Sequence, residues 1–484
     1  MREPGQGGRG GAVRDLDICW MSAIELLDAY RTGELSPVEV TETILNRIER
    51  VNPTINAIVT LTADLAMARA KESEDAYRSG KPRPLEGVPV TIKDLIPTRG
   101  IRTTLGSRLY EDHVPDVDAV LVERLRDAGT VMLGKTNVPE FGLVGVTDNV
   151  VFGPARNPWD TRKTTGGSSG GAAGALAAGL GPIAVGNDGG GSIRIPSSLC
   201  GVFGLKPQFG RVPSYPHVVR GWETMNAEGP MARTVADAAL MLDIMAGPDD
   251  RDRFSLPATP VCYLDSTRKG IDGLKIAYTQ DLATDAVDPE VAGIARDAAF
   301  SFEGFGCEVV EDTPGIPDMA QDLTTSVIME MVTANEERLE EAKEKVYPLY
   351  RPFLELGAMF SAADVVRVGF HREELWEKIW PFFERYDLLL TPTTACAAFD
   401  LKEGGTLGPD TVDGKEASPA SWVSYTFPFN FTGQPAASVP CGFTAGGLPV
   451  GLQVVGRRYD ESLVLRAAAA FEAAYPWSGR RPEL

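Results

Sequence analysis

Short β-rich runs alternate with amphipathic helical segments along most of this chain, and this alternation limits its fold more than any other feature. The runs at residues 87–94, 130–134 and 450–455 are rich in valine and other apolar residues. Between such runs lie segments with the apolar period of a helix, such as 118–128 and 461–474. This alternation predicts an α/β fold in which a sheet lies between layers of helices.

The same periodicity divides most of the remaining chain into strands and helices. Further strands are expected at 182–186, 274–279, 307–310, 388–390 and 436–439. Helices are expected after the capping box Ser36-Pro37-Val38-Glu39, at 63–79 and 288–304, and over 320–385 with a break near 347–352.

No internal repeat or obvious linker divides the chain, so one domain is predicted over residues 15–484. The Gly-rich residues 1–14 are expected to be disordered. They contain a G-x-G-x-x-G pattern at Gly5, Gly7 and Gly10, but no strand precedes it, so a dinucleotide site is not predicted.

The charge balance and the cysteine pattern exclude several classes of protein. Acidic residues outnumber basic ones by 67 to 47, and the net charge of −20 opposes binding to nucleic acid or to anionic membranes. No stretch approaches the ~18 apolar residues that a membrane-spanning helix needs, and the N-terminus lacks the pattern of a secretory leader. The six cysteines are scattered, which is typical of reduced thiols. We therefore expect a cytoplasmic protein without nucleic-acid or membrane partners.

The segment with the densest chemical signal is the Gly/Ser-rich stretch of residues 163–207. Glycines cluster at 166–171 and again at 189–191, and the second cluster ends on Ser192. Consecutive glycines let several backbone N–H groups turn toward one point, as the binding of an oxyanion requires. Either cluster alone is typical of a flexible turn, but two clusters that carry three serines indicate a catalytic site.

Two common arrangements of a serine nucleophile fit this segment poorly. Residues 166–170 match the G-x-S-x-G elbow of α/β-hydrolases, but that elbow needs a preceding strand, and residues 153–165 are polar. A serine–histidine triad needs a histidine, and the chain has only His113, His217 and His371. His113 and His371 lie in charged segments typical of the surface, whereas His217 lies in a loop that could border a pocket. Three scattered histidines also make a catalytic zinc site improbable.

A lysine can replace histidine as the base where burial lowers its pKa toward neutrality. Lys93 follows Val88, Val90 and Ile92 at the end of a predicted strand, which suits this role. From this run alone, a lysine that pairs with Asp94 and reaches solvent is the simpler interpretation.

Together, Lys93, the Gly/Ser-rich run and the segment Gly-Gly-Gly-Ser-Ile-Arg resemble the amidase signature family. Weaker similarities extend over most of the chain, at 135–141, 229–239, 386–393 and 429–442. The resemblance implies a large mixed β-sheet between layers of helices, with a Ser–cis-Ser–Lys site at about residues 85–210. It also implies that Lys93 is the base, Ser168 the bridging serine on a cis peptide, and Ser192 the nucleophile.

The activity that the resemblance implies is that of an amidohydrolase with an acyl-enzyme intermediate and no metal or organic cofactor. Neutral Lys93 would take a proton from Ser168, which takes one from Ser192 as that serine attacks the substrate carbonyl. The oxyanion would be bound by the N–H groups of Gly189, Gly190, Gly191 and Ser192.

Four neighbouring residues match, or depart from, supporting positions of the family. Asp188 and Arg194 are expected to hold the Gly-rich loop, although an ordinary local ion pair is the alternative. Ser169 is expected to be structural, with a supporting hydrogen bond to the triad as a further possibility. Asn187 stands where many members have threonine, which puts a hydrogen bond near the loop in doubt.

The substrate is less well defined by the sequence than the chemistry. Phe141, Tyr215 and Trp222 fall in segments that often border the substrate pocket in relatives, although aromatic residues are more often part of a core. If these side chains line a pocket, they favour small apolar or aryl amides, including anilides and carbamates. Esterase activity would be a side reaction of the same site.

Two alternatives remain open. One is the glutaminase-like subunit of a tRNA-dependent amidotransferase, which needs a partner protein and a charged pair that holds free glutamine. Residues 421–434 contain no ionised side chain for that purpose, which favours an uncharged substrate. The other is a non-catalytic binding protein with a relic amidase fold, which the joint presence of Lys93, Ser168 and Ser192 opposes. Both a monomer and a homodimer are compatible with the sequence.

Overall fold

The computed structural model describes residues 15–217, 224–282, 284 and 286–484. The expected disorder of residues 1–14 and the candidate pocket residue Trp222 lie outside the described residues. Within the described residues, no helix is both long and apolar enough to cross a membrane.

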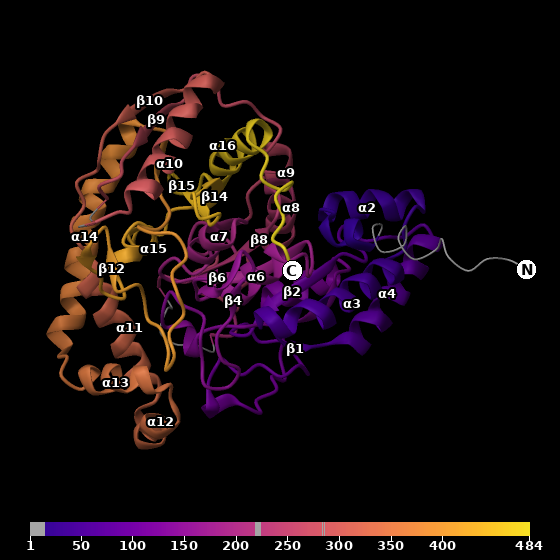
Figure 1. The fold of residues 1–484 in the computed structure, drawn as a ribbon, viewed down its shortest axis with the longest axis horizontal. Coiled ribbons are helices and arrows are strands. Elements are labelled where there is room, and N and C mark those ends of the chain that lie inside the picture. Colours follow the sequence, from indigo (N-terminus) through magenta and orange to yellow (C-terminus); the bar gives the residue numbers. More distant parts are fainter. Residues whose placement is uncertain (1–14, 218–223, 283, 285) are drawn as a thin grey trace, which may run out of the picture.

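A mixed 11-stranded sheet forms the centre of the fold, in the order β1-β3-β2-β6-β8-β7-β14-β15-β11-β9-β10. The pairs within β3-β2-β6 and within β11-β9-β10 are parallel, and the pairs between these two groups are antiparallel. Helices flank this sheet (Figure 1), which confirms the predicted fold class. Its strands are β1 (Ile58–Leu61), β2 (Pro89–Lys93), β3 (Val131–Thr136), β6 (Ile183–Asp188), β7 (Phe203–Lys206), β8 (Ala227–Ala232), β9 (Lys275–Tyr278), β10 (Glu308–Glu311), β11 (Leu388–Pro392), β14 (Ala436–Phe443) and β15 (Pro449–Gly456).

Two short hairpins lie outside the large sheet: β4 (Arg156–Asn157) with β5 (Asp160–Thr164), and β12 (Thr411–Val412) with β13 (Lys415–Glu416). The polar residues 153–165 did not predict the strand β5. Because β5 pairs with β4 in a separate sheet, the following serines do not follow a strand of the central sheet, as a nucleophile elbow requires.

The helices form the layers around the sheet, with α2, α3 and α4 at one end of the molecule and α11 to α14 at the other (Figure 1). The α-helices are α2 (Ala23–Thr32), α3 (Pro37–Ile55), α4 (Ala63–Arg78), α5 (Val120–Asp127), α6 (Gly170–Ala177), α7 (Arg194–Cys200), α8 (Val235–Met245), α9 (Tyr263–Ser266), α10 (Pro289–Phe300), α11 (Ala320–Ala334), α12 (Leu339–Lys345), α13 (Arg351–Gly357), α14 (Ala362–Arg385), α15 (Pro428–Phe431) and α16 (Glu461–Ala474). The 3₁₀ helices are Arg108–Tyr110, Glu140–Gly142, Ser301–Phe305, Glu336–Arg338, Pro348–Tyr350 and Ser421–Val423.

The long helical region expected over 320–385 is divided into the four helices α11 to α14. The break before α13 lies close to the predicted one, and prolines explain it: Pro348 begins a 3₁₀ helix and Pro352 lies in the first turn of α13. The further breaks before α12 and α14 were not predicted from the sequence. Ser361 begins α14 with a capping box to Asp364.

The alternating side chains of β6 show how the sheet divides the core. Ile183 and Val185 belong to the largest apolar cluster, together with residues of α8 and α16. Ala184, which points the other way, belongs to a smaller cluster with residues of α6 and α7. All residues of α6 are buried, so its run of glycine and alanine lets this helix lie close to the strands. The two glycine clusters are thereby fixed at the ends of α6 and β6.

Candidate active site

Lys93, Ser168 and Ser192 come from three neighbouring elements. Lys93 is the last residue of β2, Ser168 lies just before α6, and Ser192 lies between β6 and α7. Because β2 and β6 are adjacent parallel strands, their carboxyl ends lie at the same edge of the sheet. This is the usual place for a ligand site in a parallel sheet.

Lys93 is completely buried, and its Nζ lies 2.7 Å from Ser168 Oγ. Nζ also donates to the main-chain oxygen of Asn187 at 3.2 Å and to its Oδ1 at 2.5 Å. Burial lowers the pKa of Lys93 to about 7, although the carboxylates of Glu228 and Asp188 oppose this shift. A large fraction of this amine is therefore neutral near pH 7, as a general base requires.

The two serine-bearing loops are joined directly beside this lysine. The peptide bond between Gly167 and Ser168 is cis, and Ser168 is buried. The main-chain N–H of Ser169 donates to the carbonyl oxygen of Ser192 at 3.0 Å. The hydroxyl of Ser169 donates to the carbonyl oxygen of Asn187 at 3.3 Å, so its side chain supports the loop and does not bond to a triad side chain.

The Gly-rich loop offers fewer oxyanion donors than the sequence suggested. The N–H of Gly191 donates to Asp188 Oδ1 at 2.7 Å and is therefore engaged inside the loop. The N–H groups of Gly189, Gly190 and Ser192 have no acceptor among the described residues. Gly191 therefore does not belong with the oxyanion donors, and the other three N–H groups remain available.

Gly191 has a structural role that needs glycine. Its φ is +129°, and a Cβ atom there would collide with Thr426 Oγ1. The Thr426 hydroxyl donates to the carbonyl oxygen of Gly190 at 2.7 Å, which fixes the orientation of this peptide. The segment around residue 426 thus shapes the loop from the opposite side.

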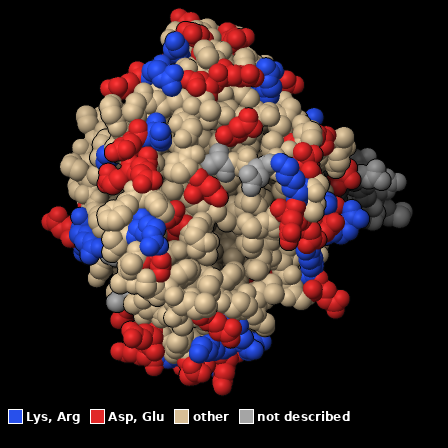
Figure 2. All heavy atoms as spheres, turned by 90° about the vertical axis from the view of Figure 1, so that its left-hand side faces the viewer, with Lys and Arg blue, Asp and Glu red and all other residues tan. Residues whose placement is uncertain are grey.

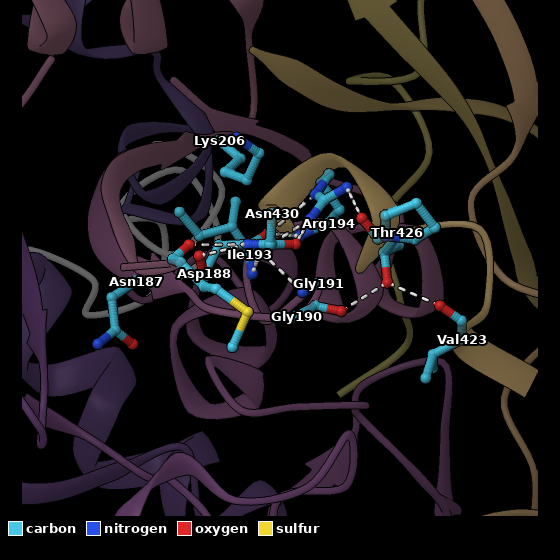
Figure 3. A network of polar contacts seen from close by, with 12 residues as sticks. Asn187, Asp188, Gly190, Gly191, Ile193, Arg194, Lys206, Val423, Thr426 and Asn430 are labelled. Carbon is cyan, nitrogen blue, oxygen red and sulfur yellow. Dashed lines mark hydrogen bonds and ion pairs between the residues drawn. The ribbon is translucent and has the colours of Figure 1, made fainter. Parts of the chain in front are cut away.

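A buried ion pair holds the same loop from within (Figure 3). Arg194 Nη2 lies 2.8 Å from Asp188 Oδ1, and both side chains are completely buried. Arg194 also donates to the carbonyl oxygen of Thr426 at 2.7 Å, and Asn430 Nδ2 donates to the carbonyl oxygen of Asp188 at 2.7 Å. Burial by itself would raise the pKa of Asp188, but the Arg194 guanidinium holds that pKa well below its usual range. Asp188 is therefore a fixed negative charge and not a proton carrier.

Replacing Arg194 by methionine is expected to destabilise the protein by about 3–5 kcal/mol, because the buried Asp188 carboxylate loses its counterion. Amide hydrolysis should fall as well, since the Gly-rich loop loses its support. The measurement is urea-induced unfolding. The matched control is Arg162→Met, which removes an arginine paired with Asp160 but 81% exposed. Equal unfolding midpoints for the two variants would contradict a structural role of the buried pair.

Two cavities of different character meet at Ser192. The smaller one measures about 40 Å³, and half of its lining residues are polar, including Ser168, Asn187, Ser214 and Glu228. The larger one measures about 350 Å³ and is mostly apolar. Its apolar lining comes chiefly from α11 and from two loops, and includes Val144, Ile195, Leu323, Val327, Ile328 and Val423.

The structure separates the predicted pocket residues from one another. Tyr215 and the neighbouring His217 line the small cavity. Phe141 is buried against Tyr110, with ring centroids 6.1 Å apart, and lines neither of the two cavities. His371 lies away from the site, with Nδ1 2.8 Å from Asp322 Oδ1.

Three residues that line or hold the candidate site were not predicted from the sequence. Glu228 lines the small cavity from β8, and Thr426 and Asn430 hold the Gly-rich loop. Asn430 lies in the segment 429–442, and the similarity of this segment to the family was the only indication in the sequence that Asn430 belongs to the site. Nothing in the sequence marked Glu228, because β8 itself was not predicted.

The chain is similar to known proteins over nearly its whole length. The family model "Amidase" matches residues 39–465. An acylamidase of Rhodococcus erythropolis is 40% identical over 476 residues, which cover 97% of this chain and 98% of that protein. A glutamyl-tRNA(Gln) amidotransferase subunit of Moorella thermoacetica is 37% identical over 506 residues, which cover 97% and 99%.

A solved structure is also similar over nearly the whole chain. A bacterial aryl acylamidase of the amidase signature family superposes with a TM-score of 0.90 at 33% identity, covering 95% of this chain and 97% of that one. The family match and these relatives extend over nearly the whole chain and include both the sheet and the Gly/Ser-rich loops. The chain therefore belongs to the amidase family and is an amide-cleaving hydrolase.

Proposed function

We propose that this enzyme hydrolyses small apolar or aryl amides, including anilides and carbamates, through an acyl-enzyme on Ser192. The observation that carries the proposal is the buried Lys93–Ser168 hydrogen bond beside Ser192, at the junction of a polar and an apolar cavity. The acylamidase and the aryl acylamidase to which the chain is similar support the same substrate class.

In the proposed reaction, Ser192 Oγ attacks the substrate carbonyl while Ser168 accepts its proton and passes its own to neutral Lys93. The 2.7 Å separation of Lys93 Nζ and Ser168 Oγ suits this transfer. The same relay then protonates the leaving nitrogen as the C–N bond breaks, and water hydrolyses the resulting ester of Ser192.

The negative charge that develops on the carbonyl oxygen is stabilised by main-chain donors. We assign this role to the N–H groups of Gly189, Gly190 and Ser192, which have no other acceptor among the described residues. Each such donor typically contributes about 2.7–4 kcal/mol to transition-state stabilisation. The Asp188–Arg194 pair acts through the loop by keeping these donors in place.

The distribution of charge favours an uncharged group in the large cavity. The described residues that line the large cavity include no charged side chain. Figure 2 shows the face that lies to the left in Figure 1: its charged side chains gather toward the rim, and its middle is largely uncharged and hollowed. Apolar groups lose little on entering such a cavity and gain from leaving water.

The glutaminase-like amidotransferase subunit is the second candidate, because such subunits are among the similar proteins. Free glutamine carries an α-carboxylate, which requires a cationic partner in a buried site. Among the described residues that line the two cavities, no lysine or arginine is present, and Glu228 is the one carboxylate. This lining favours an amide without a free carboxylate over glutamine.

The test is a panel of three substrates: 4-nitroacetanilide, an aryl carbamate and glutamine. We expect release of the chromogenic amine or phenol from the first two and no release of ammonia from glutamine. Hydrolysis of glutamine alone would overturn the proposed substrate class in favour of the amidotransferase subunit. Absence of all three activities, together with failure of a phosphonofluoridate to label the protein, would favour the relic binding protein.

A further inference from the structure

Glu228 is a buried acidic residue in the small cavity to which the hydrolytic mechanism assigns no step. It lies in β8, where it pairs in register with Asn187 of β6, whose side chain accepts a hydrogen bond from Lys93. The side chain is 7% exposed and lines the same cavity as Ser168 and Ser192. The carboxyl group of Glu228 therefore borders the space in front of the proposed nucleophile.

The hydrogen bonds of this carboxyl group are incomplete. Oε1 accepts from Ser214 Oγ and from Asn226 Nδ2, both at the long distance of 3.3 Å. Oε2 is buried and has no hydrogen-bond partner among the described residues. Buried carboxylate oxygens are normally paired, because an unpaired one loses its hydration without compensation. A ligand with a donor group would supply the missing partner.

Several charged or titratable groups surround Glu228. Lys93 of β2, Asp252 and His217 face Glu228 or share its cavity, and Asp188 of β6 acts on Lys93. Burial raises the pKa of Glu228 to about 7, and the positive charge of Lys93 opposes this shift. The carboxyl group is thus mainly ionised above pH 7, where Lys93 is mainly neutral and provides little compensating charge.

The size of the small cavity limits which part of a substrate enters it. A volume of about 40 Å³ corresponds to a few water molecules and therefore to a chain of only a few heavy atoms. An aromatic ring fits the apolar cavity of about 350 Å³ on the other side of Ser192. For an aryl amide, this division leaves the short acyl group to the small cavity.

We propose that Glu228 makes the small cavity a subsite for a short acyl group that ends in an ammonium group. The ammonium would donate to the unpaired Oε2, and Glu228 would thereby select amino-acyl anilides over alkyl ones. The inference rests on the proposed function, because it assumes that Ser192 cleaves the amide bond between the two cavities.

The experiment compares two anilides that differ in one group. β-Alanyl 4-nitroanilide carries an ammonium where butyryl 4-nitroanilide of equal chain length carries a methyl group. Above pH 7, the wild-type enzyme is expected to have the higher kcat/KM for the β-alanyl substrate. In Glu228→Gln this preference should fall by about 10- to 100-fold, mainly through the KM of the β-alanyl substrate. The control Glu49→Gln removes an exposed charge from α3 and should keep the wild-type preference.

Two results would overturn the subsite. One is a wild-type enzyme that cleaves the butyryl anilide at least as well as the β-alanyl anilide. This comparison uses no variant, so it does not depend on whether Glu228→Gln folds. The other is a Glu228→Gln variant that lowers kcat/KM for both substrates equally, which would make Glu228 a positioning residue for Lys93. Cleavage that survives in Ser192→Ala would instead overturn the proposed function itself.

Discussion

Replacing Ser192 by alanine is expected to lower kcat for amide hydrolysis by about a million-fold, the size of effect seen when a serine nucleophile is removed. The expectation follows from position, since Ser192 lies where the two cavities meet and beside three unengaged N–H groups. Initial rates on an anilide in the wild-type and variant enzymes measure the effect. Covalent labelling by a phosphonofluoridate should disappear in the same variant.

The matched control for this variant is Ser169→Ala. Ser169 lies beside Ser168, and its hydroxyl donates only to a main-chain oxygen, that of Asn187. Its replacement should therefore cost far less activity than the loss of Ser192. If Ser192→Ala kept substantial turnover while Ser169→Ala lost it, the nucleophile would be wrongly assigned.

Replacing Lys93 by methionine is expected to lower kcat/KM by about 10²- to 10⁴-fold, the usual contribution of a general base. In the wild-type enzyme, activity should rise with pH through about 7 and level off above it, because burial lowers the pKa of Lys93 to about 7 and the neutral amine is the active form. Burial also raises the pKa of Glu228 to about 7. The rise of activity with pH therefore reflects the coupled titration of Lys93 and Glu228. If Lys93→Met kept both the wild-type rate and the wild-type rise of activity with pH, Lys93 would not be the base.

The buried Lys93 should also make the free energy of unfolding depend on pH. Its folded pKa of about 7 lies below the ordinary lysine pKa of 10.5, so the unfolded chain binds more protons between these two values. The free energy of unfolding is therefore expected to rise with pH across this window through this group. In Lys93→Met the contribution is absent, and its melting temperature should exceed that of the wild type most clearly below pH 7.

The predicted strands with continuous apolar runs are all present in the sheet, including β2, β3, β11 and β15. β8 was missed because its sequence contains Gly229 and Pro230, which are rare inside a central strand. Pro230 pairs in register with Val185 of β6, whereas β8 pairs with β7 only through Met231 and Ala232, so Pro230 lies beyond the ladder with β7. A pattern of local residue types contains no information about where a neighbouring ladder ends.

The candidate site likewise depends on contacts that the local sequence does not reveal. Lys93, Ser168 and Ser192 were identified through similarity to a family, whereas the run around Lys93 alone favoured an ordinary solvent-exposed lysine. The structure buries this lysine because β2 lies inside the sheet, between β3 and β6. Glu228 and Asn430 could not be predicted, since their roles depend on contacts between elements far apart in the chain.

The contacts of Asn430 and Gln453 with the Asp188–Arg194 pair bear on how the enzyme is synthesised. Asn430 bonds to Asp188 across 242 residues, and Arg194 bonds to Gln453 across 259. A ribosome therefore completes the lysine and both serines long before it adds the residues that shape the loop around the nucleophile. An unfinished or prematurely terminated polypeptide contains every reactive side chain, but not the geometry that makes the serine reactive. The geometry of the loop around Ser192 is thus complete only after nearly the whole chain has been made.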